Sequence, residues 1–122
     1  MAMPKKMLIV DDSTTSRLMI KAYTRKLRPD WVFIEAAGGK AAMETIFREP
    51  VDVASIDYNM PGMDGLTLAR RMRAQLPELR MVIFTANVQD HMKSESAGVG
   101  AGLVIKPVTE RSVAEMVRML DV

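Results

Sequence analysis

Groups that can do acid, hydroxyl or ammonium chemistry follow four short apolar runs in this sequence. In chain order these groups are Asp11 and Asp12, Asp57, Thr85, and Lys106. Short apolar runs bounded by turn formers are typical of buried strands. The carboxyl ends of parallel strands meet at one edge of a sheet, and open α/β sheets bind their ligands at that edge. The spacing therefore predicts one site assembled from four strand ends.

The stretch from residue 53 to residue 65 carries the clearest of these signals. It begins as an apolar run with β-branched members and stops at the carboxylate of Asp57. The turn formers that follow are Asn59, Pro61, Gly62, Asp64 and Gly65. A helix cannot continue through them, so Asp57 is expected where a buried strand gives way to a loop. Taken alone, the stretch leaves two interpretations open: a ligand-binding aspartate, or a turn-initiating aspartate that hydrogen-bonds its own loop.

The carboxylates of Asp11, Asp12 and Asp57 would repel one another at a shared edge and take up protons unless a cation lay among them. A hard ion that prefers oxygen suits such a site, and Mg²⁺ is satisfied by a few carboxylates, a backbone carbonyl and water. Zinc and copper are disfavoured, because the sequence has no cysteine and its one histidine, His91, lies elsewhere. We therefore expect Mg²⁺ as the cofactor.

Lys106 adds a positive charge to the expected acidic site. The compact ammonium group of lysine suits an anion, and phosphate is the anion most often handled together with Mg²⁺. A carboxylate nucleophile at Asp57, a divalent cation, a lysine and a hydroxyl donor at Thr85 together describe phosphoryl transfer onto Asp57. Such a transfer asks the protein mainly for positioning and charge neutralisation.

Strands and helices are expected to alternate along the whole chain. The apolar runs predict strands over residues 6–10, 31–36, 53–57, 80–85 and 103–105. Helical spacing predicts helices from the cap at Ser13 to Pro29, over residues 40–48, 66–75 and 88–97, and from about Thr109 onward. Leu27 is expected among the residues of the first helix that face inward. This alternation implies an α/β fold, a doubly wound five-stranded parallel sheet with helices on both faces.

Length, charge and composition bound the classes of function. A chain of 122 residues is expected to form one domain, residues 1–122, without disulfides or structural metal. The net charge of +2 is small and both signs are mixed along the chain, so no nucleic-acid or membrane partner is implied. The first apolar run is too short for a signal peptide, and no run approaches membrane-spanning length. We expect a cytoplasmic protein.

With these motifs in order, the chain resembles the receiver domains of two-component response regulators, and in layout the single-domain, CheY-like members. The matching parts are Asp11-Asp12, the loop of residues 57–65, Thr85-Ala86 and Lys106-Pro107. The resemblance covers essentially the whole chain. It implies a (βα)5 flavodoxin-like fold with strand order 2-1-3-4-5, an order that the residues alone do not indicate.

The resemblance also implies a metal site made of particular groups. The side chains of Asp12 and Asp57 and the backbone carbonyl of Asn59 would hold Mg²⁺. Asp11 would bind the ion mostly through water. These assignments come from the family pattern, which the residues of this sequence match one by one.

For the phosphoryl group, the resemblance makes Asp57 the phosphoacceptor. Lys106 would pair with one phosphoryl oxygen and Thr85 would hydrogen-bond another, while the small Ala86 would leave room for the group. The Lys106-Pro107 peptide is expected to be cis, a conformation that only an X-Pro bond reaches at modest cost.

The implied function is a switch in two-component signal transduction. The phosphohistidine of a sensor histidine kinase would phosphorylate Asp57, and the new conformation would bind a downstream protein through the face made by the fourth helix, fifth strand and fifth helix. The alternative is a phosphorelay intermediate that passes its phosphate to a histidine phosphotransfer protein. The domain would act on itself, not as an enzyme with a separate turnover substrate, and would be a monomer or weak dimer.

Two other classes of protein are weighed against this function. An aspartate-nucleophile phosphatase usually has a second aspartate two residues after the nucleophile as general acid, and this chain has Asn59 there. An interaction module that has lost phosphorylation would not need the complete acidic set together with Thr85 and Lys106.

Two places in the chain bear on how such a switch would receive and pass on its signal. Family members commonly carry an aromatic residue three positions before the lysine, where this chain has Leu103. We therefore predict that movement of the loop of residues 85–90 carries the signal and that Leu103 only packs. Thr14, Thr15 and Arg17 lie at the start of the first helix, where the family docks its kinase. From the residues alone they belong to a solvated helix face.

Overall fold

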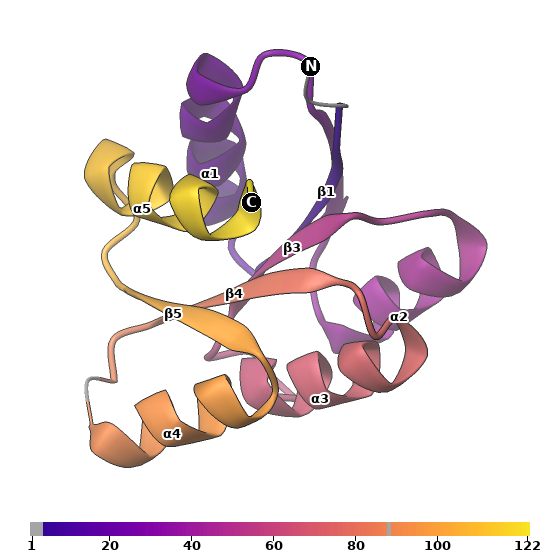
Figure 1. Cartoon of the computed structure of the whole chain (residues 1–122), viewed down its shortest axis with the longest axis vertical. Coiled ribbons are helices and arrows are strands. Elements are labelled where there is room, and N and C mark those ends of the chain that lie inside the picture. The colour runs from indigo at the N-terminus through magenta and orange to yellow at the C-terminus, as the bar shows by residue number, and fades with distance from the viewer. Residues whose placement is uncertain (1–3, 88) are drawn as a thin grey trace.

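The computed structural model describes residues 4–87 and 89–122, and in this part of the chain five strands alternate with five helices (Figure 1). The strands are β1 (Lys6–Val10), β2 (Val32–Ala36), β3 (Val53–Asp57), β4 (Arg80–Thr85) and β5 (Ala101–Ile105). The helices are α1 (Thr14–Leu27), α2 (Gly39–Arg48), α3 (Gly65–Gln75), α4 (Asp90–Gly98) and α5 (Glu110–Leu120). The predicted alternation is confirmed.

All five strands pair in parallel in the order β2-β1-β3-β4-β5, which confirms the order expected from the resemblance. The register is nearly level at the carboxyl ends: Val10 pairs with Ala36 and with Ile56, and Thr85 pairs with Ile105. Because the strands end together, the residues that follow them gather at one edge of the sheet.

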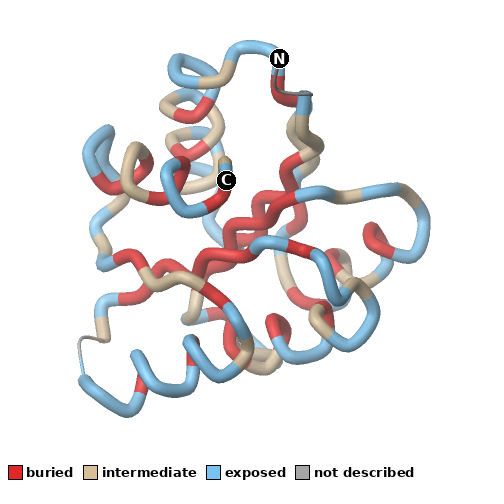
Figure 2. Tube along the Cα trace, in the orientation of Figure 1, coloured by how far each residue is buried: buried red, intermediate tan, exposed pale blue. Residues whose placement is uncertain are grey.

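Helices cover both faces of the sheet, with α1 and α5 on one face and α2, α3 and α4 on the other (Figure 1). Successive side chains of a strand point to opposite faces, so each strand supplies two cores. Leu8 and Ile56 pack under α2 and α3, whereas Ile9 and Phe84 pack under α1 and α5. Every residue of β3 is buried, and Figure 2 shows that burial is concentrated in the central strands.

Three helices begin directly after loops of the expected site, and each has a side-chain cap. The Ser13 hydroxyl accepts from the N–H of Ser16 at the start of α1, and the Asp64 carboxylate accepts from the N–H of Thr67 at the start of α3. Thr109 caps α5 through a capping box. Such caps satisfy N–H groups that the first helical turn leaves unpaired, and so fix where each loop ends.

Several boundaries differ from the sequence prediction. β5 begins at Ala101, two residues early, because Gly102 pairs with Val82 in the sheet and the Met119 side chain covers it. α4 begins at Asp90, while Val88, its predicted start, lies outside the described residues. Leu27, predicted to face inward, is 41% exposed. A helix of 14 residues is about 21 Å long and outruns a five-residue strand, so its last residue lies beyond the sheet.

The start of α3 is pressed against the end of β3. The N–H of Gly65 donates to the carbonyl of Tyr58 at 2.8 Å, which closes the loop that follows Asp57. A Cβ atom at Gly65 would lie 2.4 Å from the carbonyl oxygen of Asp57. Glycine at this position therefore lets the helix begin in contact with the strand end.

We predict that Gly65→Ala lowers the free energy of unfolding by about 1–3 kcal/mol, because the backbone at Asp57 must shift to admit the methyl group. Gly98→Ala is the matched control, since a Cβ atom there meets nothing within 4 Å. That variant should be neutral or stabilising by up to about 1 kcal/mol, as expected for alanine in a helix. Urea unfolding of both variants measures the difference, and equal stabilities would contradict the prediction.

Candidate functional site

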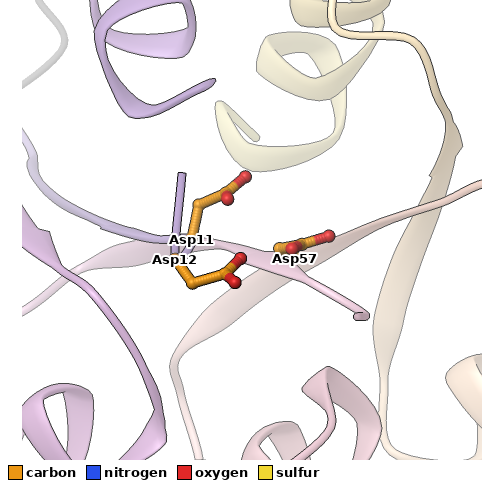
Figure 3. A group of neighbouring side chains, drawn as sticks. All are labelled: Asp11, Asp12 and Asp57. Atoms are coloured by element: carbon orange, nitrogen blue, oxygen red, sulfur yellow. The ribbon is translucent and has the colours of Figure 1, made fainter. Parts of the chain in front are cut away.

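Three carboxylates lie together at the carboxyl edge of the sheet. Asp11 and Asp12 follow β1, and Asp57 ends the neighbouring strand β3 (Figure 3). One carboxylate oxygen from each residue lies within 4.8 Å of one from each of the others. Asp11 and Asp57 are buried, whereas Asp12 is exposed. The cluster therefore has a sheltered floor and one side open to solvent.

Asp11 is held in place at three of its polar groups. Its N–H donates to the carbonyl of Ala36 at 3.1 Å, and its carboxylate accepts from the N–H of Ser13 at 2.8 Å. Its carbonyl accepts from the guanidinium of Arg17 at 2.6 Å. The loop that carries two of the three carboxylates is thus tied to β2 and to α1.

Burial raises the pKa of the Asp11 carboxyl above its ordinary value. The negative charges of Asp57 and Asp12 raise it further, while the N–H of Ser13 and the ammonium of Lys106 act in the opposite direction. Repulsion among carboxylates is the electrostatic signature of a cation site, because a bound cation would favour the charged forms. The oxygen-only donor set fits a hard ion such as Mg²⁺.

Lys106 brings the counter-charge to this edge from the end of β5. Its ammonium nitrogen lies 2.5 Å from Oδ1 of Asp57, and its side chain is 29% exposed. Its backbone N–H donates to the carbonyl of Thr85 at 2.9 Å. The peptide bond from Lys106 to Pro107 is cis, as predicted. Lys106 therefore contacts the expected nucleophile and remains partly accessible to an incoming group.

Thr85 ends β4, which lies between β3 and β5, and Ala86 follows it. Thr85 is fully buried, and its hydroxyl oxygen accepts from the N–H of Asn87 at 3.0 Å. Ala86 is exposed and lies in a groove of about 550 Å³ beside the site. The groove is lined by Ser16, Met19, Ala86, Lys106, Pro107 and Val108. A small side chain at residue 86 keeps this approach open.

The remaining residues of the predicted set divide into those near the site and those away from it. Asn59 is exposed, and its N–H lies 3.4 Å from Oδ1 of Asp57. Leu103 is partly buried against the core that packs under α2 and α3. His91 is exposed on α4, away from the acidic cluster.

Sequence reasoning missed the part played by Arg17. Its side chain is only 14% exposed, and it contacts the Asp11 carbonyl and the carboxylate of Glu35. Because the partner of Arg17 at the site is a backbone carbonyl, which every residue has, the residue types do not reveal this contact. The signal that could have found the contact is Glu35, an acidic residue near the end of β2.

No helix traced over residues 4–87 and 89–122 combines the length and the apolar character that crossing a membrane requires.

Comparison with known proteins supports a single family. The family model of the response regulator receiver domain matches residues 7–118. The chemotaxis protein CheY of Pseudomonas aeruginosa is 35% identical, with 94% of each chain covered. The sporulation initiation phosphotransferase F of Bacillus subtilis is 32% identical, over 81% of this chain and 78% of that protein.

Larger proteins also contain a similar segment. The sensor proteins TorS and EvgS of Escherichia coli are 32% and 34% identical, but this chain spans only 12% and 9% of their lengths. Among solved structures, the chemotaxis response regulator CheY4 of Vibrio cholerae has a TM-score of 0.85 at 26% identity, covering 97% of this chain and 99% of that one. With the strand order and the acidic edge already described, these matches show that the chain belongs to the receiver domains of two-component response regulators, whose role is to act as phosphotransfer switches.

Proposed function

We propose that a sensor histidine kinase phosphorylates this chain on Asp57 and that the phosphorylated form binds a downstream protein as a diffusible switch. We further propose that residues 1–122 act as one receiver domain. The observation that carries the proposal is the contact between the Lys106 ammonium and Asp57, made at the edge where three carboxylates meet. Similarity to single-domain chemotaxis proteins over nearly their full length supports the diffusible form.

The proposed cofactor is Mg²⁺. Asp12, Asp57 and the backbone carbonyl of Asn59 would hold it directly, and Asp11 mostly through water. When bound, the ion neutralises charge on the carboxylates and on the transferring phosphoryl group. The spacing of the carboxylate oxygens supports this assignment, because three carboxylates so close together make a local excess of negative charge that a cation would balance.

In the proposed reaction, a carboxylate oxygen of Asp57 attacks the phosphorus atom of a phosphohistidine. An oxygen–phosphorus bond forms, the phosphorus–nitrogen bond breaks, and its electron pair stays on the imidazole. Lys106 orients the carboxylate beforehand and then pairs with a phosphoryl oxygen. The Thr85 hydroxyl, which accepts a hydrogen bond from Asn87, has its own hydrogen to donate to a second phosphoryl oxygen.

The proposed output is a shift between two conformations. Thr85 is the first residue of the loop of residues 85–90, so a new hydrogen bond from its hydroxyl pulls on that loop. Residue 88 lies outside the described part of this loop. The face formed by α4, β5 and α5 is the proposed contact for the partner, and it exposes Ile105 at 40% of its surface. A monomer or weak dimer and a cytoplasmic location remain predictions.

The domain would catalyse its own phosphorylation and hydrolysis and would have no separate turnover substrate. A relay role is the second candidate, supported by the similarity to a protein named as a phosphotransferase. The two roles differ in one test. When the phosphorylated chain is mixed with a histidine phosphotransfer protein, a relay intermediate gives up its phosphate reversibly and a diffusible switch does not.

Phosphorylation of Asp57 is tested with small phosphodonors. Incubation with Mg²⁺ and phosphoramidate should add the mass of one phosphoryl group to the wild-type chain and none to Asp57→Asn. Asp30→Asn, a change at an exposed carboxylate in the turn between α1 and β2, is the control and should gain mass as wild type does. Intact-protein mass spectrometry makes the measurement. No gain in wild type, or an equal gain in the Asp57 variant, refutes the assignment.

Metal binding is tested through stability. At a Mg²⁺ concentration tenfold above the Kd, the wild-type chain should gain about 1.4 kcal/mol in free energy of unfolding. Asp12→Asn should lose most of this gain because it removes a charged ligand. Without divalent cations the same variant should melt a few degrees above wild type, because one repelling carboxylate is gone.

Thermal unfolding with EDTA and with Mg²⁺ measures both effects, and Asp30→Asn serves again as the control. An Asp12 variant that melts below wild type in EDTA, or gains as much from Mg²⁺, would contradict the proposed site.

The packing role of Leu103 is tested with beryllofluoride, which stands in for the phosphoryl group on Asp57. Leu103→Ala should lower stability by about 2 kcal/mol through lost packing. It should nevertheless keep the beryllofluoride-dependent amide shifts of Ala86 and Asn87, measured by NMR. Loss of those shifts in a variant that is still phosphorylated would show that Leu103 belongs to the switch.

A further inference from the structure

Arg17 joins the acidic loop to the edge of the sheet. One terminal guanidinium nitrogen, Nη1, donates to the carbonyl of Asp11 at 2.6 Å, and the other, Nη2, donates to the hydroxyl of Thr14 at 3.3 Å. The Nε–H donates to the carboxylate of Glu35 on β2 at 3.0 Å. Lys21 lies 3.7 Å from the second oxygen of Glu35. The guanidinium therefore connects the loop after β1, the start of α1 and β2.

The carbonyl that Arg17 binds is a sensitive point of the site. It belongs to the peptide group that joins Asp11 to Asp12, so its direction sets where the Asp12 side chain leaves the backbone. The N–H and the carboxylate of Asp11 are already held by Ala36 and Ser13. Arg17 adds a hydrogen bond to the carbonyl of the peptide that joins the two acidic residues, next to the contacts that already hold Asp11.

The contacts of Arg17 indicate that it positions the acidic loop and does not act mainly through its charge. The Arg17 guanidinium is paired directly with the Glu35 carboxylate, which also pairs with Lys21. The contact of Arg17 with Asp11 is to the backbone carbonyl and not to the carboxylate. The charges that act on the pKa of the Asp11 carboxyl, after burial, are those of Asp57, Lys106 and Asp12. A planar guanidinium with donors in fixed directions can hold three oxygen atoms at once, which an ammonium group cannot do in the same geometry.

We infer that Arg17 is a positioning residue for cation binding: it holds the peptide between Asp11 and Asp12 so that both carboxylates meet Asp57. This inference rests on the proposed function, because it concerns the affinity of the same acidic site for Mg²⁺. It differs from the interpretation of Arg17 as part of a solvated face, because its guanidinium is turned inward onto the loop and Glu35.

The test measures the Kd for Mg²⁺ by calorimetric titration of the full chain. Arg17→Met should bind Mg²⁺ about tenfold more weakly, the size of effect seen when groups that orient metal ligands are removed. Arg17→Lys should bind at least threefold more weakly although it keeps the charge. Arg25→Met is the matched control, since the Arg25 guanidinium lies on the same helix over the ring of Phe33. Its Kd should stay within twofold of wild type.

A second readout separates positioning from the chemistry of transfer. With phosphoramidate as donor, Arg17→Met should need about tenfold more Mg²⁺ to reach half of its maximal phosphorylation rate. At saturating Mg²⁺ that rate should lie within twofold of wild type, because Asp57, Lys106 and Thr85 are untouched. A merely structural defect would instead lower the rate at every Mg²⁺ concentration, and that result would overturn the inference.

The remaining outcomes also decide the question. A wild-type Kd in Arg17→Met overturns the inference, and a wild-type Kd in Arg17→Lys shows that charge suffices and overturns positioning. If Arg17→Met does not fold, Glu35→Gln replaces it in the test, since this change loosens Arg17 from β2 without touching Asp11. A Kd for Mg²⁺ that is twofold to threefold weaker supports the inference, and an unchanged Kd overturns it. Failure of the wild-type chain to bind Mg²⁺ overturns the proposed function itself.

Discussion

Repulsion among three carboxylates at one sheet edge is the constraint around which this domain is built. Bringing Asp11, Asp12 and Asp57 together costs free energy, because like charges at short range in a partly buried site are poorly screened. The fold bears that cost by anchoring the acidic residues to buried strands, above all to β3, whose residues are all buried. The ion pair from Lys106 to Asp57 offsets part of the repulsion. The remaining repulsion is what the proposed cation would balance.

The parallel register turns this constraint into a compact site. Val10 pairs with Ile56, Asp57 with Phe84 and Thr85 with Ile105, so the strands deliver their functional groups at the same edge. The helix caps then end the loops within a few residues, which leaves little slack in the backbone that carries these groups. Geometry that depends on backbone pairing in this way is insensitive to most surface substitutions and sensitive to a clash such as the one at Gly65.

Much of this arrangement could be predicted from the sequence, because short apolar runs and the turn formers after them indicate where each strand ends. The end of β3 at Asp57 follows from an apolar run that stops at turn formers, and the site residues follow from the same rule applied to each strand. The strand order could not be derived this way, since pairing between distant strands leaves no local mark, and it came from the resemblance. Gly102 falls outside the predicted strand over residues 103–105, because glycine weakens strands, but it pairs with Val82 in the sheet and Met119 fills the space above it. Arg17 was missed because its partner at the site is a backbone carbonyl.

Arg17 and Lys106 show why two cations beside the same carboxylates are not interchangeable. The guanidinium of Arg17 reaches three oxygen atoms in fixed directions and pairs with Glu35, so its contacts define the shape of the loop. The ammonium of Lys106 contacts Asp57 from a flexible, partly exposed side chain, so in the proposed reaction it would turn to a phosphoryl oxygen without moving the backbone. A guanidinium at residue 106 would hold the Asp57 carboxylate more rigidly and resist that exchange, and an ammonium at residue 17 would leave the loop free to move. The proposed function therefore assigns a fixed position to the Arg17 guanidinium and a change of partner to the Lys106 ammonium.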